Sequence, residues 1–123
     1  MYSFIPTKPS KMKKIDAIIR KSLFDEVRDA LHEANVYFFS YWDVTGVGHE
    51  KKGKVYRGVS YSTSDIQRRY LSIVVNDDFV KPTVIAILKA GNTGEVGDGK
   101  IFVTPVEEAY RIRTGESGDQ TLK

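Results

Sequence analysis

The sequence has no cysteine, no long apolar run and little excess charge of either sign. Without cysteine there is no disulfide framework, no thiol chemistry and no cysteine-based zinc site. No apolar stretch approaches the length of a signal-peptide core or a membrane-spanning helix. We therefore expect a cytoplasmic protein that does not insert directly into a membrane.

The overall composition is that of an ordinary globular chain, with 41% hydrophobic and 28% charged residues. A length of 123 residues is enough for one domain, which would bury about two-thirds of the surface of the unfolded chain. The net charge of +3 suits anionic ligands but is too small to indicate nucleic acid by itself.

The pattern of apolar residues predicts two repeats of strand, helix and strand. Branched and aromatic runs predict strands at residues 15–20, 37–44, 69–75 and 100–104, with a short final strand at 109–112. Helical spacing predicts one helix that Ser22 caps and another that Gly91 ends. This order is typical of a ferredoxin-like α+β fold, an antiparallel sheet with two helices on one face. Strands with apolar residues on both faces predict self-association through the uncovered face.

The ends of the chain and one internal segment lack this periodicity. Residues 1–11 contain two prolines, and we interpret them as a linker, a tag remnant or a fusion junction. The domain then spans residues 12–116, and residues 117–123 are expected to form a flexible tail. A polar segment at about 49–67 is predicted to be a long loop, and a loop of this length in a compact domain is usually functional or mobile.

The stretch TGEVGDGK, residues 93–100, places three glycines before a lysine. Glycine lets successive backbone N–H groups turn towards one anion, and Lys100 adds a positive charge beside them. The spacing differs from a P-loop, and a strand rather than a helix follows, which also excludes the Rossmann fingerprint. The alternative is an ordinary turn from helix to strand.

The stretch Arg111-Ile112-Arg113 offers a second set of positive charges. On a strand, alternate residues project to the same side, so the two guanidinium groups would point together and could clamp a polyphosphate. The alternative is a solvated edge strand whose charges prevent aggregation. An RNA-recognition motif is disfavoured, because Val59 follows Arg57-Gly58 where that motif requires an aromatic residue. The chain offers no combination of nucleophile, base and orienting group, so we expect no enzyme.

Four stretches resemble the PII nitrogen-regulatory signal transduction proteins in order and spacing: KKIDAII (13–19), YRGVSY (56–61), TGEVGDGKIFV (93–103) and RIRTGE (111–116). The resemblance covers about residues 12–116. It implies a homotrimer that senses energy and carbon-nitrogen status. It also implies that the long loop binds a target protein, such as an ammonium transporter or a nitrogen-metabolism enzyme.

The resemblance further implies that ATP or ADP lies in the cleft between neighbouring subunits. The positions that correspond to the family's nucleotide site are Gly46, Val74, Thr93, Gly94, Gly97, Asp98, Gly99, Lys100, Arg111 and Arg113. The backbone of 97–99 and the side chains of Lys100, Arg111 and Arg113 would meet the phosphates. Gly46, Val74 and Thr93 would lie at the adenine and ribose end.

Family members also bind 2-oxoglutarate through a Mg²⁺ ion shared with ATP, and the corresponding positions here are Gly48, Glu50 and Arg68. The family usually has glutamine at the position of Glu50 and lysine at that of Arg68. A carboxylate at Glu50 would repel the dicarboxylate unless the metal screens it, although carboxylates can also ligate Mg²⁺. Two alternatives follow: a full carbon-nitrogen sensor, or an adenine-nucleotide sensor insensitive to 2-oxoglutarate, fused or docked to a membrane transporter. The sequence by itself defines no metal site.

Two loop residues are candidates for contacts with other proteins. Tyr61 aligns with the tyrosine that some family members have uridylylated, and the alternative is an exposed tyrosine that contacts a partner. Arg57 lies in the same loop and is assigned to the partner surface.

Overall fold

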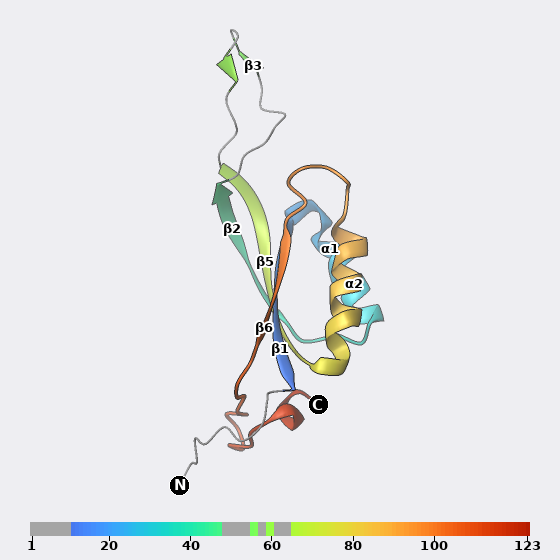
Figure 1. Ribbon diagram of the computed structural model, residues 1–123, viewed down its shortest axis with the longest axis vertical. Coiled ribbons are helices and arrows are strands. Elements are labelled where there is room, and N and C mark those ends of the chain that lie inside the picture. Colours follow the sequence, from blue (N-terminus) through green and yellow to red (C-terminus); the bar gives the residue numbers. More distant parts are fainter. Residues whose placement is uncertain (1–10, 48–54, 57–58, 61–64) are drawn as a thin grey trace.

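The computed structural model describes residues 11–47, 55–56, 59–60 and 65–123 of the chain. Strands β1 (Met12–Arg20), β2 (Ser40–Val47), β5 (Asp65–Asn76) and β6 (Lys100–Pro105) form an antiparallel sheet in the order β2-β5-β1-β6 (Figure 1). Helices α1 (Phe24–Glu33) and α2 (Val80–Gly91) cover one face of it. The predicted ferredoxin-like order and layering are confirmed.

Shorter elements complete the description. β3 (Val55–Tyr56) pairs with β4 (Val59–Ser60) in an antiparallel hairpin within the predicted long loop, and β5 takes up the last residues of that loop. Three 3₁₀ turns lie at Lys21–Leu23, Asp77–Phe79 and Asp119–Leu122. Within the described residues, no helix combines the length and the apolar character that a membrane span requires.

The hydrophobic core lies between the sheet and the two helices. Alternate residues of a strand face the same side, and in the middle of β1 and β5 the residues facing the helices are apolar. The core residues from these strands and the helices include Ile15, Ala17, Ile19, Leu71, Ile73, Val75, Val27, Leu31, Ala86 and Ile87. Burial of these side chains fixes the register of the central strands and therefore the position of everything attached to their ends.

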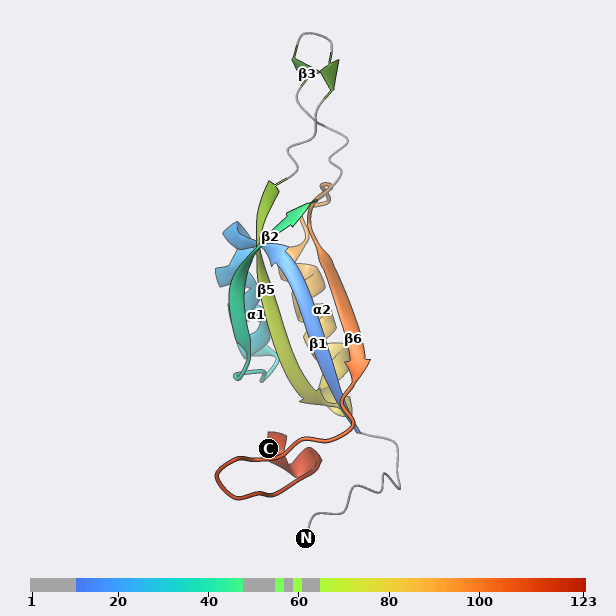
Figure 2. The same ribbon diagram turned by 90° about the vertical axis from the view of Figure 1, so that its left-hand side faces the viewer.

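The opposite face of the sheet carries no helix, as Figure 2 shows by looking onto it. Trp42 of β2 stacks on Tyr70 of β5 with ring centroids 4.6 Å apart, and both remain partly accessible to solvent. Phe102 of β6 is half exposed, whereas Asp16 at the middle of β1 is buried. A face with this apolar content is typical of a protein that associates with other subunits.

The start of α1 differs from the prediction. Ser22 does not cap the helix: it lies in the 3₁₀ turn, and α1 begins at Phe24 without any side-chain cap. The Phe24 ring is buried, 4.5 Å from the ring of Tyr41, and the Arg69 guanidinium lies over it at 4.6 Å. Packing of this aromatic residue therefore determines where the helix begins. Asn35, with φ of 65°, follows the end of the helix.

The boundaries of β2 were also predicted wrongly. Tyr37 and Phe38 are exposed and precede the strand, which continues through Gly46 instead of breaking there. Gly46 pairs with Ile66, because β5 extends back to Asp65 and offers a partner. Pairing with a neighbouring strand overrides the tendency of a glycine to interrupt a strand.

The predicted final strand at 109–112 does not form. Tyr110 and Ser117 make an isolated bridge, and the chain between them turns back on itself. The N–H of Arg111 donates to the carbonyl of Glu116 at 2.8 Å, and the N–H of Gly115 donates to the carbonyl of Arg111 at 2.7 Å. Gly115 has φ of +74°, a value that favours glycine and permits the turn. The two arginines therefore lie in a turn and do not alternate along a strand.

Candidate functional site

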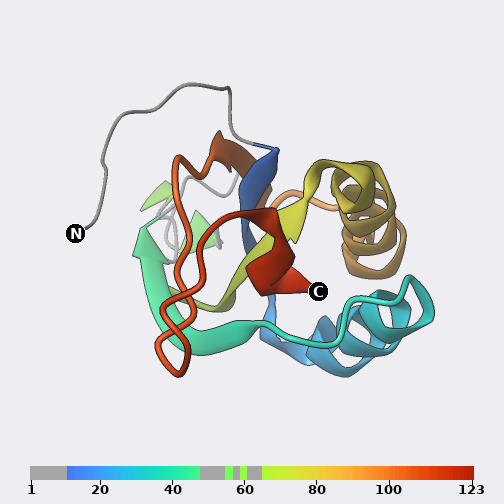
Figure 3. The ribbon, with the colours of Figure 1, turned by 90° about the horizontal axis from the view of Figure 1, so that it is seen from below.

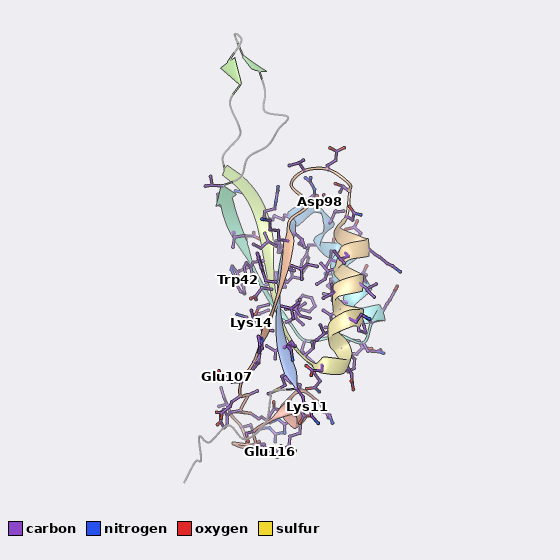
Figure 4. The ribbon with its side chains drawn as sticks, in the orientation of Figure 1. Lys11, Lys14, Trp42, Asp98, Glu107 and Glu116 are labelled. Atoms are coloured by element: carbon purple, nitrogen blue, oxygen red, sulfur yellow. The ribbon has the colours of Figure 1, made fainter. Side chains whose placement is uncertain are left out.

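The glycine loop, residues 92–99, connects α2 to β6 and is organised around the carboxylate of Asp98 (Figure 4). The backbone N–H groups of Thr93 and Gly94 donate to Oδ2 of Asp98 at 2.9 and 3.0 Å, and the Thr93 hydroxyl donates to Oδ1 at 2.5 Å. Arg20 at the end of β1 donates its Nε–H to Oδ1 at 2.9 Å. These bonds, the Thr93 hydroxyl first and Arg20 second, hold the pKa of Asp98 well below its usual range. The carboxylate is thus ionised and bonded within the loop.

Two glycines of this loop adopt conformations that other residues disfavour. Gly97 and Gly99 have φ of +103° and +106°. A Cβ on Gly99 would overlap the carbonyl oxygen of Ile18, and a Cβ on Gly97 would lie 2.8 Å from Nη2 of Arg68. The glycines therefore let the loop lie directly against the end of β1 and the arginine of β5.

The same loop leaves backbone donors available. Within the described residues, no hydrogen bond is found from the N–H groups of Gly97 and Gly99, and the side chain of Lys100 makes no hydrogen bond or ion pair. Unpaired N–H groups that lie close together beside a cation are suited to holding an anion, with phosphate oxygens as the strongest acceptors.

A cavity of about 800 Å³ opens beside the loop, between α2 and β6. Asn92, Asp98 and Lys100 line its polar end, while Ile18, Leu88 and Phe102 are among the apolar residues that line the rest. This volume and this lining fall within the usual range for small-molecule sites.

The second cluster of positive charge, the arginine turn (residues 110–117), lies beyond the far end of β6. Figure 4 shows Asp98 and Glu116 at opposite ends of the sheet, and Figure 3 views the molecule from the end that carries the turn. Nη1 of Arg111 donates to Oε2 of Glu116 at 2.9 Å, and its Nη2 donates to the carbonyl of Gln120 at 3.5 Å. Arg113 is exposed, and its side chain contacts no charged or polar partner among the described residues.

Comparison with known proteins identifies the family of this fold. The family model described as Nitrogen regulatory protein P-II matches residues 12–116. The chain belongs to the PII family.

The PII relatives match over nearly their whole length. The chain is 43% identical over 112 residues to the nitrogen regulatory protein P-II of Azospirillum brasilense, a match that covers 90% of this chain and 100% of the relative. The P-II protein of Nostoc punctiforme gives the same identity and coverage. The crystal structure of Arabidopsis thaliana PII bound to citrate superposes with a TM-score of 0.73 at 32% identity, covering 90% of this chain and 89% of that one. These relatives are named as regulatory proteins, which points to a function other than catalysis.

The PII fold distributes the predicted nucleotide residues between the two ends of one chain. Thr93, Gly94, Gly97, Asp98, Gly99 and Lys100 lie together in the glycine loop, and Arg68 reaches it from β5. Val74 lies towards the other end of β5, where it lines a second cavity of about 370 Å³ with Phe38, Phe79 and Leu122. Arg111 and Arg113 belong to this second end. Gly46 lies in β2 and pairs with Ile66 of β5. The positions Gly48, Glu50, Arg57 and Tyr61 lie outside the described residues.

One residue that contacts the glycine loop was missed by sequence reasoning. Arg20 was interpreted only as the charged end of a strand, yet it binds both Asp98 and the carbonyl of Val96, the latter at 3.0 Å from Nη2. The β1–β6 register pairs Ile18 with Lys100, so two further residues bring Arg20 level with Asp98. An acidic residue within a loop that is predicted to bind an anion is the signal that could have prompted a search for a neighbouring cation.

Proposed function

We propose that this PII chain forms a homotrimer that binds ATP or ADP in the clefts between neighbouring subunits and reports their balance to a target protein. The observation that carries the proposal is the two unpaired backbone N–H groups of Gly97 and Gly99, held by glycine conformations beside Lys100. The nucleotide phosphates would accept hydrogen bonds from these donors, and Lys100 would neutralise part of their charge.

The separation of the two charged clusters supports a site shared by two subunits. In one chain, the length of β6 lies between Lys100 and the arginine turn, so a single nucleotide cannot reach both. A second copy, packed through the uncovered sheet face, would bring its Arg111, Arg113 and Val74 to the glycine loop of the first. Trp42, Tyr70 and Phe102 supply the apolar surface that such packing would bury.

The nucleotide would act on the target through the loop at about 49–67. β2 and β5 lead directly into this segment, and their ends lie near the glycine loop, because the Arg68 guanidinium approaches Gly97. ATP and ADP would select different conformations of the loop, which the target protein then distinguishes. We propose a cytoplasmic location and a target of the nitrogen-metabolism or ammonium-transporter type. In this scheme Tyr61 and Arg57 contact the partner.

A second candidate function rests on Glu50 and Arg68. As a full carbon-nitrogen sensor, the protein would bind 2-oxoglutarate next to ATP, with Arg68 pairing to a carboxylate of the ligand and Glu50 contributing to Mg²⁺. As an energy sensor alone, it would reject 2-oxoglutarate because the Glu50 carboxylate repels it. That form would act on a membrane transporter to which it is docked or fused.

Calorimetric titration separates these functions. ATP with Mg²⁺, and then ADP, are titrated into the purified protein in a citrate-free buffer, because the Arabidopsis relative was bound to citrate. The ATP titration is then repeated with saturating 2-oxoglutarate. Binding of 2-oxoglutarate only in the presence of ATP supports the full sensor. Nucleotide binding that 2-oxoglutarate leaves unchanged supports the energy sensor, and absence of nucleotide binding contradicts both.

A further inference from the structure

We infer that Arg20 is a positioning residue for the glycine loop: it neutralises Asp98 and fixes the backbone at Val96, so that the N–H groups of Gly97 and Gly99 can donate to a phosphate. This inference rests on the proposed nucleotide function, but it adds a residue to which no direct ligand contact is assigned.

The geometry of Arg20 suits this role. Its side chain, only 26% exposed, reaches from the end of β1 to two points on either side of Gly97. Nε bonds to Oδ1 of Asp98 at 2.9 Å, and Nη2 bonds to the carbonyl oxygen of Val96 at 3.0 Å. A guanidinium presents several donors in a fixed plane, so one arginine can hold both points at once, whereas a lysine has a single nitrogen.

The charge of Asp98 explains why such a residue is needed. The carboxylate lies between the two glycines whose N–H groups would meet the phosphates, and it is fixed there by Thr93 and Gly94. Without a cation, this carboxylate would repel any anion bound by the loop. The ion pair with Arg20 removes the repulsion while the carboxylate continues to shape the loop.

Four variants test the inference in the full chain. Arg20→Ala removes both contacts and leaves Asp98 uncompensated. Arg20→Lys keeps the charge but loses the planar guanidinium that spans Asp98 and the Val96 carbonyl. Arg20→Ala combined with Asp98→Asn removes the charge that needs compensation and keeps one oxygen for Thr93. Lys21→Ala is the matched control, because Lys21 also carries one positive charge but pairs with Asp43 at 2.9 Å instead of with the loop.

The dissociation constant for ATP with Mg²⁺ should follow a defined order. We expect Arg20→Ala to weaken binding by about tenfold to a hundredfold, the range for losing a charge-assisted contact. Arg20→Lys should fall between this variant and the wild type, and the added Asp98→Asn change should restore most of the affinity. Lys21→Ala should bind like the wild type. A purely structural role for Arg20 would give no rescue by Asp98→Asn, and that result would overturn the neutralising role.

Hydrogen exchange provides a readout without nucleotide. In Arg20→Ala, the hydrogen-bonded backbone amides of residues 93–95 should exchange faster, while those of α2 keep their wild-type protection. Unchanged exchange in the loop, or unchanged ATP affinity, would overturn the inference. A wild-type protein that fails to bind ATP would instead contradict the proposed function, and the exchange experiment would still decide whether Arg20 positions the loop.

Discussion

The glycine loop and the arginine turn would hold the same nucleotide, yet the single chain prepares them differently. In the glycine loop, the acidic residue Asp98 is directed inward and paired with Arg20, which leaves the backbone donors unpaired. In the arginine turn, the acidic residue Glu116 is paired with Arg111, one of the proposed ligands. The glycine loop therefore has donors available for an anion, whereas in the arginine turn the Glu116 carboxylate already occupies Arg111.

This difference predicts how each half responds to a ligand. In the glycine loop, the N–H groups of Gly97 and Gly99 have no acceptor among the described residues, so changes there should act directly on affinity. At the arginine turn, the phosphate must replace Glu116 at a partly exposed ion pair, and exposed pairs contribute only about 0.2–1 kcal/mol. Replacing Glu116 by phosphate therefore costs little free energy, but this cost reduces the net contribution of Arg111 to binding.

The largest expected effect on ATP affinity comes from disrupting the glycine loop. Gly99→Ala places a Cβ on the carbonyl of Ile18 and forces a left-handed conformation that costs about 1–2 kcal/mol for other residues. The loop must move, and we expect ATP affinity to fall by more than about tenfold. Calorimetry measures the affinity and thermal melting measures the stability. Gly94→Ala is the control, since its φ of +80° gives similar strain with no atom within 4 Å; equal losses in both variants would contradict the steric argument.

Removing one cation from the glycine loop and one from the arginine turn compares the contributions of the two segments to ATP binding. Lys100→Ala and Arg113→Ala should each weaken ATP binding by about tenfold to a hundredfold, because each removes a charge-assisted contact with phosphate. Light scattering should give the wild-type assembly in both. Lys89→Ala, on the exposed side of α2, should change neither property. Wild-type affinity in both cation variants would refute the assignment of the phosphates.

A smaller effect of opposite sign is expected from Glu116. Glu116→Gln removes the internal competitor for Arg111, and ATP should bind up to about fivefold more tightly, the equivalent of a weak ion pair. Glu107→Gln removes the same charge from an exposed position nearby and is the control. If both variants gain equally, the effect is one of net charge. A loss of affinity in Glu116→Gln would show that Glu116 supports the ligand instead of competing with it.

The smallest effect concerns stability against acid. Because Thr93 and Arg20 lower the pKa of Asp98 below 3.8, this carboxylate stabilises the fold above about pH 4, and the stabilisation is lost as the pH falls through the lowered pKa. Asp98→Asn lacks this dependence. The difference in melting temperature between wild type and variant should therefore be largest near neutral pH and shrink towards about pH 2. A difference that grows on acidification would contradict the assignment.

Much of this architecture is predictable from the sequence because burial determines it. Runs of branched and aromatic residues predicted the central strands β1 and β5, and Gly91 correctly marked the end of α2. The glycine loop was recognised because its composition has a direct conformational meaning. The motif of this loop and the three other stretches that resemble PII proteins predicted the family, and the comparisons confirmed it.

The errors arose where particular contacts, some of them distant in the chain, decide the local structure. The start of α1 depends on Phe24 packing against Tyr41, which Ser22 could not reveal. The turn at Arg111 depends on hydrogen bonds with Glu116 and Gly115, whereas the sequence predicted a strand at 109–112. Arg20 was missed because its partner Asp98 is 78 residues away in the chain. Placement of the two half-sites at opposite ends of β6 likewise required the three-dimensional structure.

Subunit mixing tests most directly whether one nucleotide is held by the glycine loop of one subunit and the arginine turn of another. Lys100→Ala and Arg113→Ala chains are unfolded together in equal amounts, refolded, and titrated with ATP and Mg²⁺. Random assembly of trimers should give about a quarter of the clefts both intact halves, and these should bind with wild-type affinity. If both halves acted within one subunit, no cleft would be intact, and the mixture would bind no better than the separate variants.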